Sequence, residues 1–90
     1  MKKAIVSVIG TDKKGIIARV SGLLFELGIN VEDISQTIMQ QYFTMIMLVD
    51  LSEANLAFSE IADKLQKTGE EIGVDIRIQS EAIFQAMHRI

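Results

Sequence analysis

The spacing of apolar residues changes between two periods along this chain, and the order of those changes restricts the possible folds more than any other feature. Segment 4–9 is a short β-branched run closed by Gly10, which is typical of a strand buried on both faces. From Gly15 onward the apolar residues recur at helical spacing. They form one stripe, which predicts an amphipathic helix of about twelve to fourteen residues: Ile16, Val20, Leu23, Leu24 and Leu27.

A glycine marks the end of this helix. With Gly28 at the C′ position, Ile29 follows at C″ and can contact Leu24, as in a left-handed glycine cap. Segments 31–39 and 42–51 then read as two strands joined by Gln40-Gln41. Neither glutamine favours the positive φ of a tight hairpin turn, so the pattern predicts a hairpin without fixing its register.

The two strands of this hairpin differ in polarity. Segment 42–51 carries apolar residues at both odd and even positions, which predicts a central strand. Segment 31–39 mixes acidic and hydroxyl side chains among its apolar positions, as a half-exposed edge strand does. The spacing from Val31 to Ile34 indicates a bulge.

A second helical pattern extends over 55–72, with Asn55 as a plausible N-cap and Gly73 beyond its end. Segment 74–79 alternates as a strand with one buried face, and 81–90 reads as a short amphipathic C-terminal helix. The order βαββαβ predicts an α+β, ferredoxin-like sandwich, in which two helices cover one face of a four-stranded antiparallel sheet. A chain this short supports one domain, residues 1–90.

Helices on one face leave the other sheet face open. Ile5, Ile9 and one parity of segment 42–51 would then form an apolar patch of a few hundred Å², which exceeds what a monomer usually exposes. The C-terminal helix could cover it, from the same chain or swapped from a neighbour. We favour a homodimer or a larger symmetric oligomer such as a tetramer.

Composition excludes several classes of function. A net charge of −3 and a pI near 5.0 lack the basic surface that nucleic-acid binding requires. The absence of cysteine removes disulfides, thiolate nucleophiles and cysteine-based metal sites, and fits a reducing cytoplasm. We therefore expect no metal and no cofactor. We also expect no membrane partner, because no apolar run is long enough to span a bilayer and no signal-peptide pattern appears.

The segment "VSVIGTDKKGIIARVSGLLFELGINVEDISQ" resembles the opening βαβ unit of an ACT domain, and nearly the whole chain fits that pattern. The matching marks are Gly10-x-Asp12-x-x-Gly15, the pair Leu23-Leu24, and Gly28-Ile29-Asn30-Val31. The chain is similar to stand-alone bacterial ACT proteins and, more distantly, to the glycine cleavage system repressor group. Lys14 stands where many ACT domains have proline.

This resemblance implies a regulatory domain that binds a small molecule, often an amino acid, near the first β–α loop where two domains pair. Unpaired amides at a helix start attract a carboxylate, and Asp12 could answer a ligand ammonium. The residues expected to bind ligand are Thr11, Asp12, Lys13, Lys14, Gly15, Ile16, Asn30 and Val31. Each also has a purely structural interpretation: Asp12 as an N-cap, Asn30 as a turn residue, and the lysines as solvated charges.

Two alternatives to ligand sensing remain at this point. A module that docks another protein without any small molecule is the stronger one. Acylphosphatases share the topology, and Gly10, Gly15 and Arg19 loosely match their phosphate loop, but the spacing is too long and Asp12 would repel phosphate. We therefore expect no enzymatic activity and no catalytic residue, and we interpret His88, the single histidine, as structural.

Overall fold

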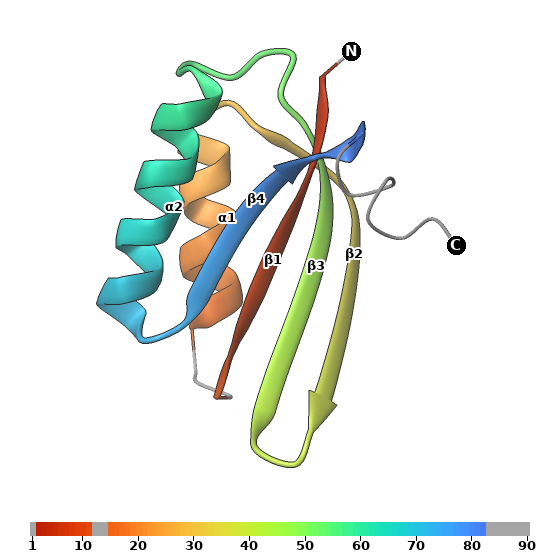
Figure 1. The fold of residues 1–90 in the computed structure, drawn as a ribbon, viewed down its shortest axis with the longest axis vertical. Helices are drawn as coiled ribbons and strands as arrows, with labels where there is room; N and C mark the ends of the chain where they lie inside the picture. Colours follow the sequence, from red (N-terminus) through yellow and green to blue (C-terminus); the bar gives the residue numbers. More distant parts are fainter. Residues whose placement is uncertain (1, 12–14, 83–90) are drawn as a thin grey trace.

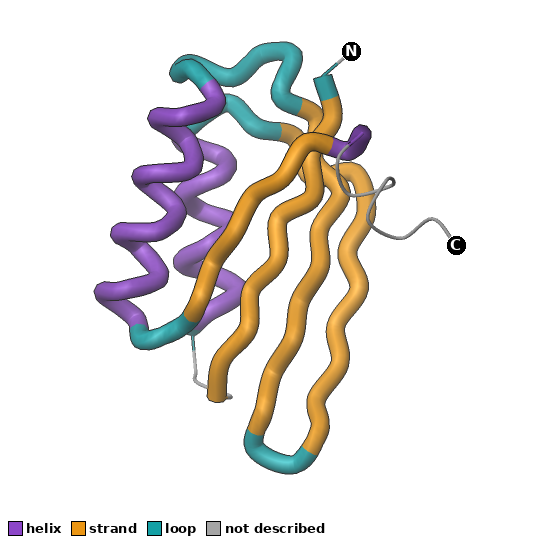
Figure 2. The backbone as a smooth tube through the Cα atoms, viewed as in Figure 1, coloured by secondary structure: helices purple, strands orange, loops and turns teal. Residues whose placement is uncertain are grey.

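The computed structural model describes residues 2–11 and 15–82. Its elements are β1 (Lys3–Thr11), α1 (Ile16–Glu26), β2 (Asn30–Met39), β3 (Tyr42–Asp50), α2 (Phe58–Ile72) and β4 (Asp75–Ser80). All strand pairs are antiparallel and the sheet order is β2-β3-β1-β4, with both helices on one face (Figures 1 and 2). The predicted ferredoxin-like fold is confirmed. Residues 81 and 82 begin a helical turn, and the rest of the expected C-terminal helix lies outside the described residues.

The core lies between the sheet and the two helices. Alternate residues of β1 face the helices, as do alternate residues of β3, where Met45 and Met47 are fully buried. The helices contribute the stripes that the sequence predicts, and their innermost side chains are Val20, Leu24, Ile61 and Leu65. Because β1 and β3 occupy the two central positions, the interpretation of segment 42–51 as a central strand is confirmed.

The end of α1 has the geometry that its glycine predicts. Gly28 adopts φ +73°, its amide donates to the carbonyl of Phe25 at 3.1 Å, and the amide of Ile29 donates to the carbonyl of Leu24 at 2.9 Å. These two bonds define a Schellman motif. They satisfy carbonyls that a helix end otherwise leaves without partners.

Asn55 does not cap α2, contrary to the prediction. The helix begins at Phe58 with Ala57 as its N-cap, and the Ala57 amide donates to the Glu60 carboxylate at 3.4 Å. The Asn55 side-chain amide instead donates to the carbonyl of Glu26 at 2.9 Å, and its backbone amide donates to Leu27 at 2.9 Å. Asn55 thus caps the end of α1, a tertiary role that the local sequence pattern does not reveal.

The β2–β3 hairpin closes with a two-residue turn between Met39 and Tyr42, and the predicted bulge is present between Val31 and Asp33. The turn places Gln40 at φ +57°. Side chains with a Cβ adopt this left-handed conformation at a cost, whereas glycine does not. The glutamine turn is therefore strained.

Replacing Gln40 with glycine should raise the free energy of unfolding by about 0.5–1 kcal/mol, because the positive φ is then free of steric cost. Urea unfolding of the two proteins measures the difference. Gln41→Gly is the matched control, since Gln41 is not among the positive-φ residues and gains nothing from glycine. Equal effects of the two changes would contradict the assignment of strain to Gln40.

The open sheet face carries exposed apolar residues, as the sequence predicts. Ile9 is 50% exposed and Ile46 is 37% exposed, and Tyr42 and Met39, on the same face, are 54% and 68% exposed. Ile5 is only 8% exposed, although it does not belong to the core cluster under the helices. The expected exposure is thus confirmed for Ile9 and for one parity of β3, but not for Ile5.

Candidate functional site

The elbow between β1 and α1 is the first part of the expected ligand site. The helix begins at Ile16 and its N-cap is Gly15, at φ +85°, with no capping side chain and no acidic residue in the first turn. The interpretation of Asp12 as the N-cap is therefore wrong. The first helical bond runs from the Arg19 amide to the Gly15 carbonyl at 2.9 Å, so the amides of residues 16–18 have no acceptor within the helix.

Residues around the elbow differ in how far they are available to a ligand. Thr11 and Gly15 are exposed, and a Cβ added at Gly15 would meet nothing within 4 Å. Ile16 is only 3% exposed and belongs to the core, so little of its side chain can contact a ligand. Asp12, Lys13 and Lys14 lie outside the described residues.

Asn30 and Val31, the second part of the expected site, lie at the opposite end of the sheet. Asn30 pairs with Asp50 at one end of β3, whereas Thr11 is opposite Tyr42 at the other end (Figure 1). At about 3.4 Å per residue, β3 separates these ends by roughly 27 Å. One protomer therefore cannot bring Asn30 and the elbow to the same small molecule.

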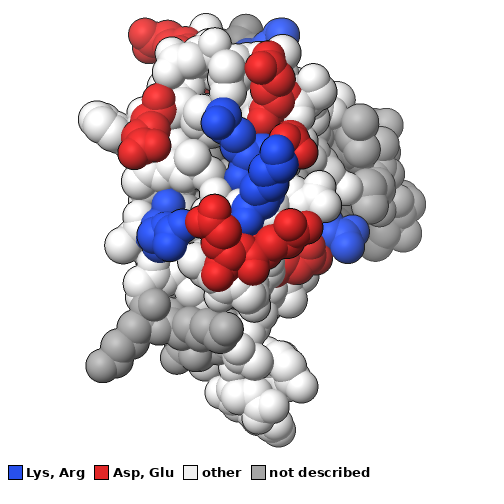
Figure 3. Space-filling view, turned by 90° about the vertical axis from the view of Figure 1, so that its left-hand side faces the viewer, with Lys and Arg blue, Asp and Glu red and all other residues white. Residues whose placement is uncertain are grey.

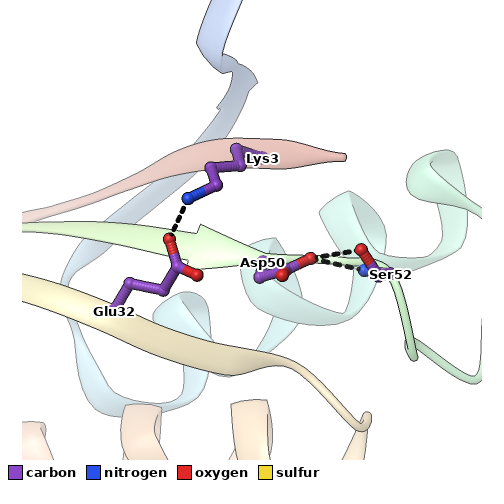
Figure 4. Close-up of polar contacts among 4 residues, drawn as sticks. All are labelled: Lys3, Glu32, Asp50 and Ser52. Carbon is purple, nitrogen blue, oxygen red and sulfur yellow. Dashed lines mark hydrogen bonds and ion pairs between the residues drawn. The ribbon is translucent and has the colours of Figure 1, made fainter. Parts of the chain in front are cut away.

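A polar cluster of Lys3, Glu32, Asp50 and Ser52 (Figure 4) lies at the end of the sheet where Asn30 pairs with Asp50. Glu32 lies at the bulge of β2 and accepts a hydrogen bond from Lys3 of β1. Asp50 accepts bonds from the amide and hydroxyl of Ser52 at 2.8 and 2.6 Å. The bond to Glu32 raises the pKa of Lys3, and the bonds from Ser52 lower the pKa of Asp50. The bond between Lys3 and Glu32 thus joins β1 to β2 across β3 at this end of the sheet.

The side-chain amide of Asn30 takes no part in this cluster. Asn30 is exposed, and no other residue in the described ranges forms a hydrogen bond with its side chain. An amide group can donate and accept, so Asn30 remains available to a ligand or to another chain.

One side of the molecule carries exposed apolar residues at an unpaired sheet edge. β2 is the outermost strand of the sheet and nearly all of it is exposed, including Ile34 and Ile38. On α1, Ile17 and Phe25 are exposed, and Phe25 is 84% exposed. We call this set, Ile17, Phe25, Ile34 and Ile38, the β2-edge surface.

The orientation of α1 places Ile17 and Phe25 on the β2 side. Arg19 donates to Glu71 of α2 at 2.9 Å, so the Arg19 side of α1 faces α2. At about 100° per residue, Ile17 and Phe25 lie roughly 120–160° around the helix from Arg19. The same ion pair engages the arginine on which the acylphosphatase comparison depends.

A cavity of about 500 Å³ lies at the end of the sheet where β1 begins and β4 finishes. Its walls come from the start of β1, the connection between β3 and α2, the first turns of α2, and residues 80–82. We call it the end cavity. Sequence analysis did not find it, because Leu51, Leu56 and Ile61 look like ordinary packing positions and no motif joins them to Lys2.

Charges over the helical side are mixed. Figure 3 shows acidic and basic side chains interspersed on this face. Among them, Lys67 and Asp63 pair at 3.1 Å. The described residues contain no group of three acidic or histidine side chains that could hold a metal ion. No helix within the described ranges has the length and apolarity needed to cross a membrane.

Comparisons with known proteins match the fold and much of the sequence. The family model described as "ACT domain" matches residues 2–79. The UPF0237 protein of Clostridium acetobutylicum is 56% identical over 88 residues, which cover 98% of this chain and 99% of that protein. An "ACT domain protein from Streptococcus pneumoniae" has a solved structure that superposes with a TM-score of 0.82 at 46% identity, covering 97% of this chain and 98% of that one.

Two larger solved structures contain a similar unit. The regulatory subunit of aspartate kinase from Thermus thermophilus, in a ligand-free form, is 28% identical with a TM-score of 0.65, covering 87% of this chain and 50% of that one. A putative glycine cleavage system transcriptional repressor has a TM-score of 0.77 at 23% identity, covering 88% of this chain and 45% of that one, and shares the fold.

Proposed function

This chain belongs to the ACT domain family, and we propose that it is a cytoplasmic regulatory module that binds an amino acid between two copies of itself. The observation that carries the proposal is the separation of the elbow from Asn30 within one protomer. A second copy resolves that separation. The similarity to the regulatory subunit of aspartate kinase supports a regulatory role.

Pairing of two β2 strands would bring the separated parts together. An unpaired edge strand offers a row of free amides and carbonyls to another strand. A twofold axis at the middle of β2 makes the two edge strands antiparallel, so the Asn30 end of one protomer lies beside the Met39 end of its partner. The elbow is at the Met39 end of the sheet. Each twofold pair therefore creates two equivalent sites.

The same pairing would bury the β2-edge surface. Ile17 and Phe25 of α1 flank the edge strand, so helices of the two protomers would meet beside the joined strands. An aromatic side chain that is 84% exposed contributes little to a monomer and much to an interface. The apolar side chains of this surface favour a homodimer over an isolated protomer.

The chemistry of the composite site suits a zwitterion. The amides of residues 16–18, which have no acceptor within the helix, and the positive end of α1 attract a carboxylate. The Asn30 amide of the partner can accept a hydrogen bond from the ligand ammonium. Asp12, Lys13 and Lys14 remain part of the proposed site as sequence-based expectations, and Thr11 and Gly15 form its exposed rim.

A thermal-shift screen against the twenty amino acids, combined with light scattering, tests this proposal. We expect a dimer, and an increase in Tm of about 10–20 °C at 100-fold the dissociation constant of the true ligand, equivalent to about 2.7 kcal/mol. Asn30→Ala should abolish the shift and leave the dimer intact. Phe25→Asp should abolish both the dimer and the shift, because it introduces a charge into the apolar β2-edge surface that the interface would bury.

Gln66→Asp is the control for Phe25→Asp, because it adds the same charge on an exposed position of α2. It should change neither mass nor shift. A monomer at micromolar concentration would contradict the proposal. A dimer that no amino acid stabilises would instead favour the alternative, a module that docks another protein through this fold without a small molecule.

A further inference from the structure

The end cavity lies at the end of the sheet that carries Asn30, but it shares no lining residue with the proposed site between subunits. Its lining residues lie at the start of β1, in the β3–α2 connection and at the end of β4, far from the elbow. None of its lining residues belongs to β2 or α1. A volume of about 500 Å³ falls within the range of pockets that hold small organic molecules, roughly 300–1,000 Å³. The cavity therefore needs its own explanation.

Most of the cavity wall is apolar. Leu51 and Ile61 form its buried part, Leu56 is half-buried, and Phe58 is exposed at the first position of α2. Ala54 and Ala57 leave the room that larger side chains would fill. These walls suit a compact aliphatic or aromatic group rather than a sugar or a free phosphate.

The two lysines that line the cavity differ in whether they already have an acidic partner. Lys3 bonds to Glu32, and Glu81 and Asp50 also contribute to the raised pKa of Lys3. Lys2 is exposed, and its side chain has no acidic partner within the described ranges. A cation without a partner therefore stands at the mouth of an apolar cavity.

We propose that the end cavity binds a small carboxylic acid with an apolar body, whose carboxylate pairs with Lys2 while its aliphatic or aromatic group enters between Leu51, Leu56, Phe58 and Ile61. The apolar group supplies affinity by leaving water, and the lysine orients the acid. Glu81 also lines the cavity, and its negative charge acts on Lys3, where it helps to raise the pKa of that lysine. This inference does not depend on the proposed dimer site.

Titration of ¹⁵N-labelled protein with 3-phenylpropionate and with 4-methylpentanoate tests the proposal by two-dimensional NMR. We expect saturable shifts centred on the amides of Leu51, Leu56, Phe58 and Ile61, with a dissociation constant of about 1 mM or tighter. Phenylalanine and leucine serve as second arms that add only the amino group. We expect the amino acids to bind no more tightly than the acids that lack the amino group.

Four variants make the test specific. Lys2→Gln should weaken binding about fivefold, the effect of one exposed ion pair, whereas Lys64→Gln, the same change on the exposed face of α2, should have no effect. Ala54→Trp should fill the cavity and abolish binding, and its NMR spectrum reports whether the fold is retained. If Ala54→Trp fails to fold, Phe58→Ala takes its place in the test. Phe58→Ala removes one wall of the cavity and should therefore weaken binding.

The proposal would be overturned by the absence of saturable shifts, by shifts centred outside the end cavity, or by equal weakening from Lys2→Gln and Lys64→Gln. Tight binding of the amino acids alone would also reject it, because the amino group would then be required. Asn30→Ala and Phe25→Asp separate this site from the one between subunits. Both variants should retain acid binding in the end cavity even where they abolish the response expected for the dimer.

Discussion

Replacing Gly28 with alanine should lower the free energy of unfolding by about 3 kcal/mol, because the new methyl group meets backbone that cannot move aside. Gly28 adopts φ +73°, which costs a residue with a Cβ about 1 kcal/mol. The added Cβ would also lie 2.6 Å from the carbonyl oxygen of Glu53. Overpacking of this kind costs about 1–3 kcal/mol. The two terms together give the expected loss.

Gly15→Ala separates the two terms. Gly15 has φ +85°, close to that of Gly28, but a Cβ there would meet nothing within 4 Å. Its loss should be limited to the backbone cost of about 1 kcal/mol. Urea unfolding of Gly28→Ala and Gly15→Ala measures the free energy of unfolding that each variant loses. Equal losses would show that the contact with Glu53 relaxes and that the left-handed backbone alone accounts for the effect.

The position of Gly28 explains why this end of α1 could be predicted from sequence. A Schellman motif is built from neighbouring residues, and the spacing of Leu24, Gly28 and Ile29 is enough to define it. The same holds for the bulge near Val31 and for the strand–helix order, which follow from local periodicity. Local patterns therefore specified the fold and most boundaries.

Features that depend on distant residues could not be predicted. Asn55 looks like an N-cap, but the close approach of its loop to α1 gives it the carbonyl of Glu26 as a partner. The ion pair of Lys3 with Glu32 joins residues from two strands that are not neighbours in the sheet. No spacing in the sequence records such contacts, because they arise only when the elements pack.

The candidate site shows the same limit. The sequence suggests that Gly15 and Asn30 share one ligand, since both flank α1, but the helix and the sheet place them at opposite ends of the protomer. The end cavity was missed altogether, because three separate segments of the chain build it. Which residues meet at one place depends on how the elements pack, and residue types alone do not record that.

The two glycines inside helices give the second large prediction, because alanine should have opposite effects at them. Gly69 of α2 is buried, and a Cβ there would lie 2.6 Å from the carbonyl oxygen of Val74, the residue before β4. Gly69→Ala should therefore lower the free energy of unfolding by about 2 kcal/mol, in spite of the higher helix propensity of alanine. At Gly22 of α1 a Cβ would meet nothing within 4 Å.

Gly22→Ala should raise the free energy of unfolding by about 0.5–1 kcal/mol, since only helix propensity changes there. The sequence alone indicates that Gly69 weakens the last turn of its helix. The structure indicates instead that this glycine lets the chain return closely to the sheet, where the Val74 amide donates to the Gly69 carbonyl at 2.9 Å. Chemical denaturation of both variants decides between these views. Stabilisation by both alanines would mean that helix propensity dominates and that β4 can shift away from α2.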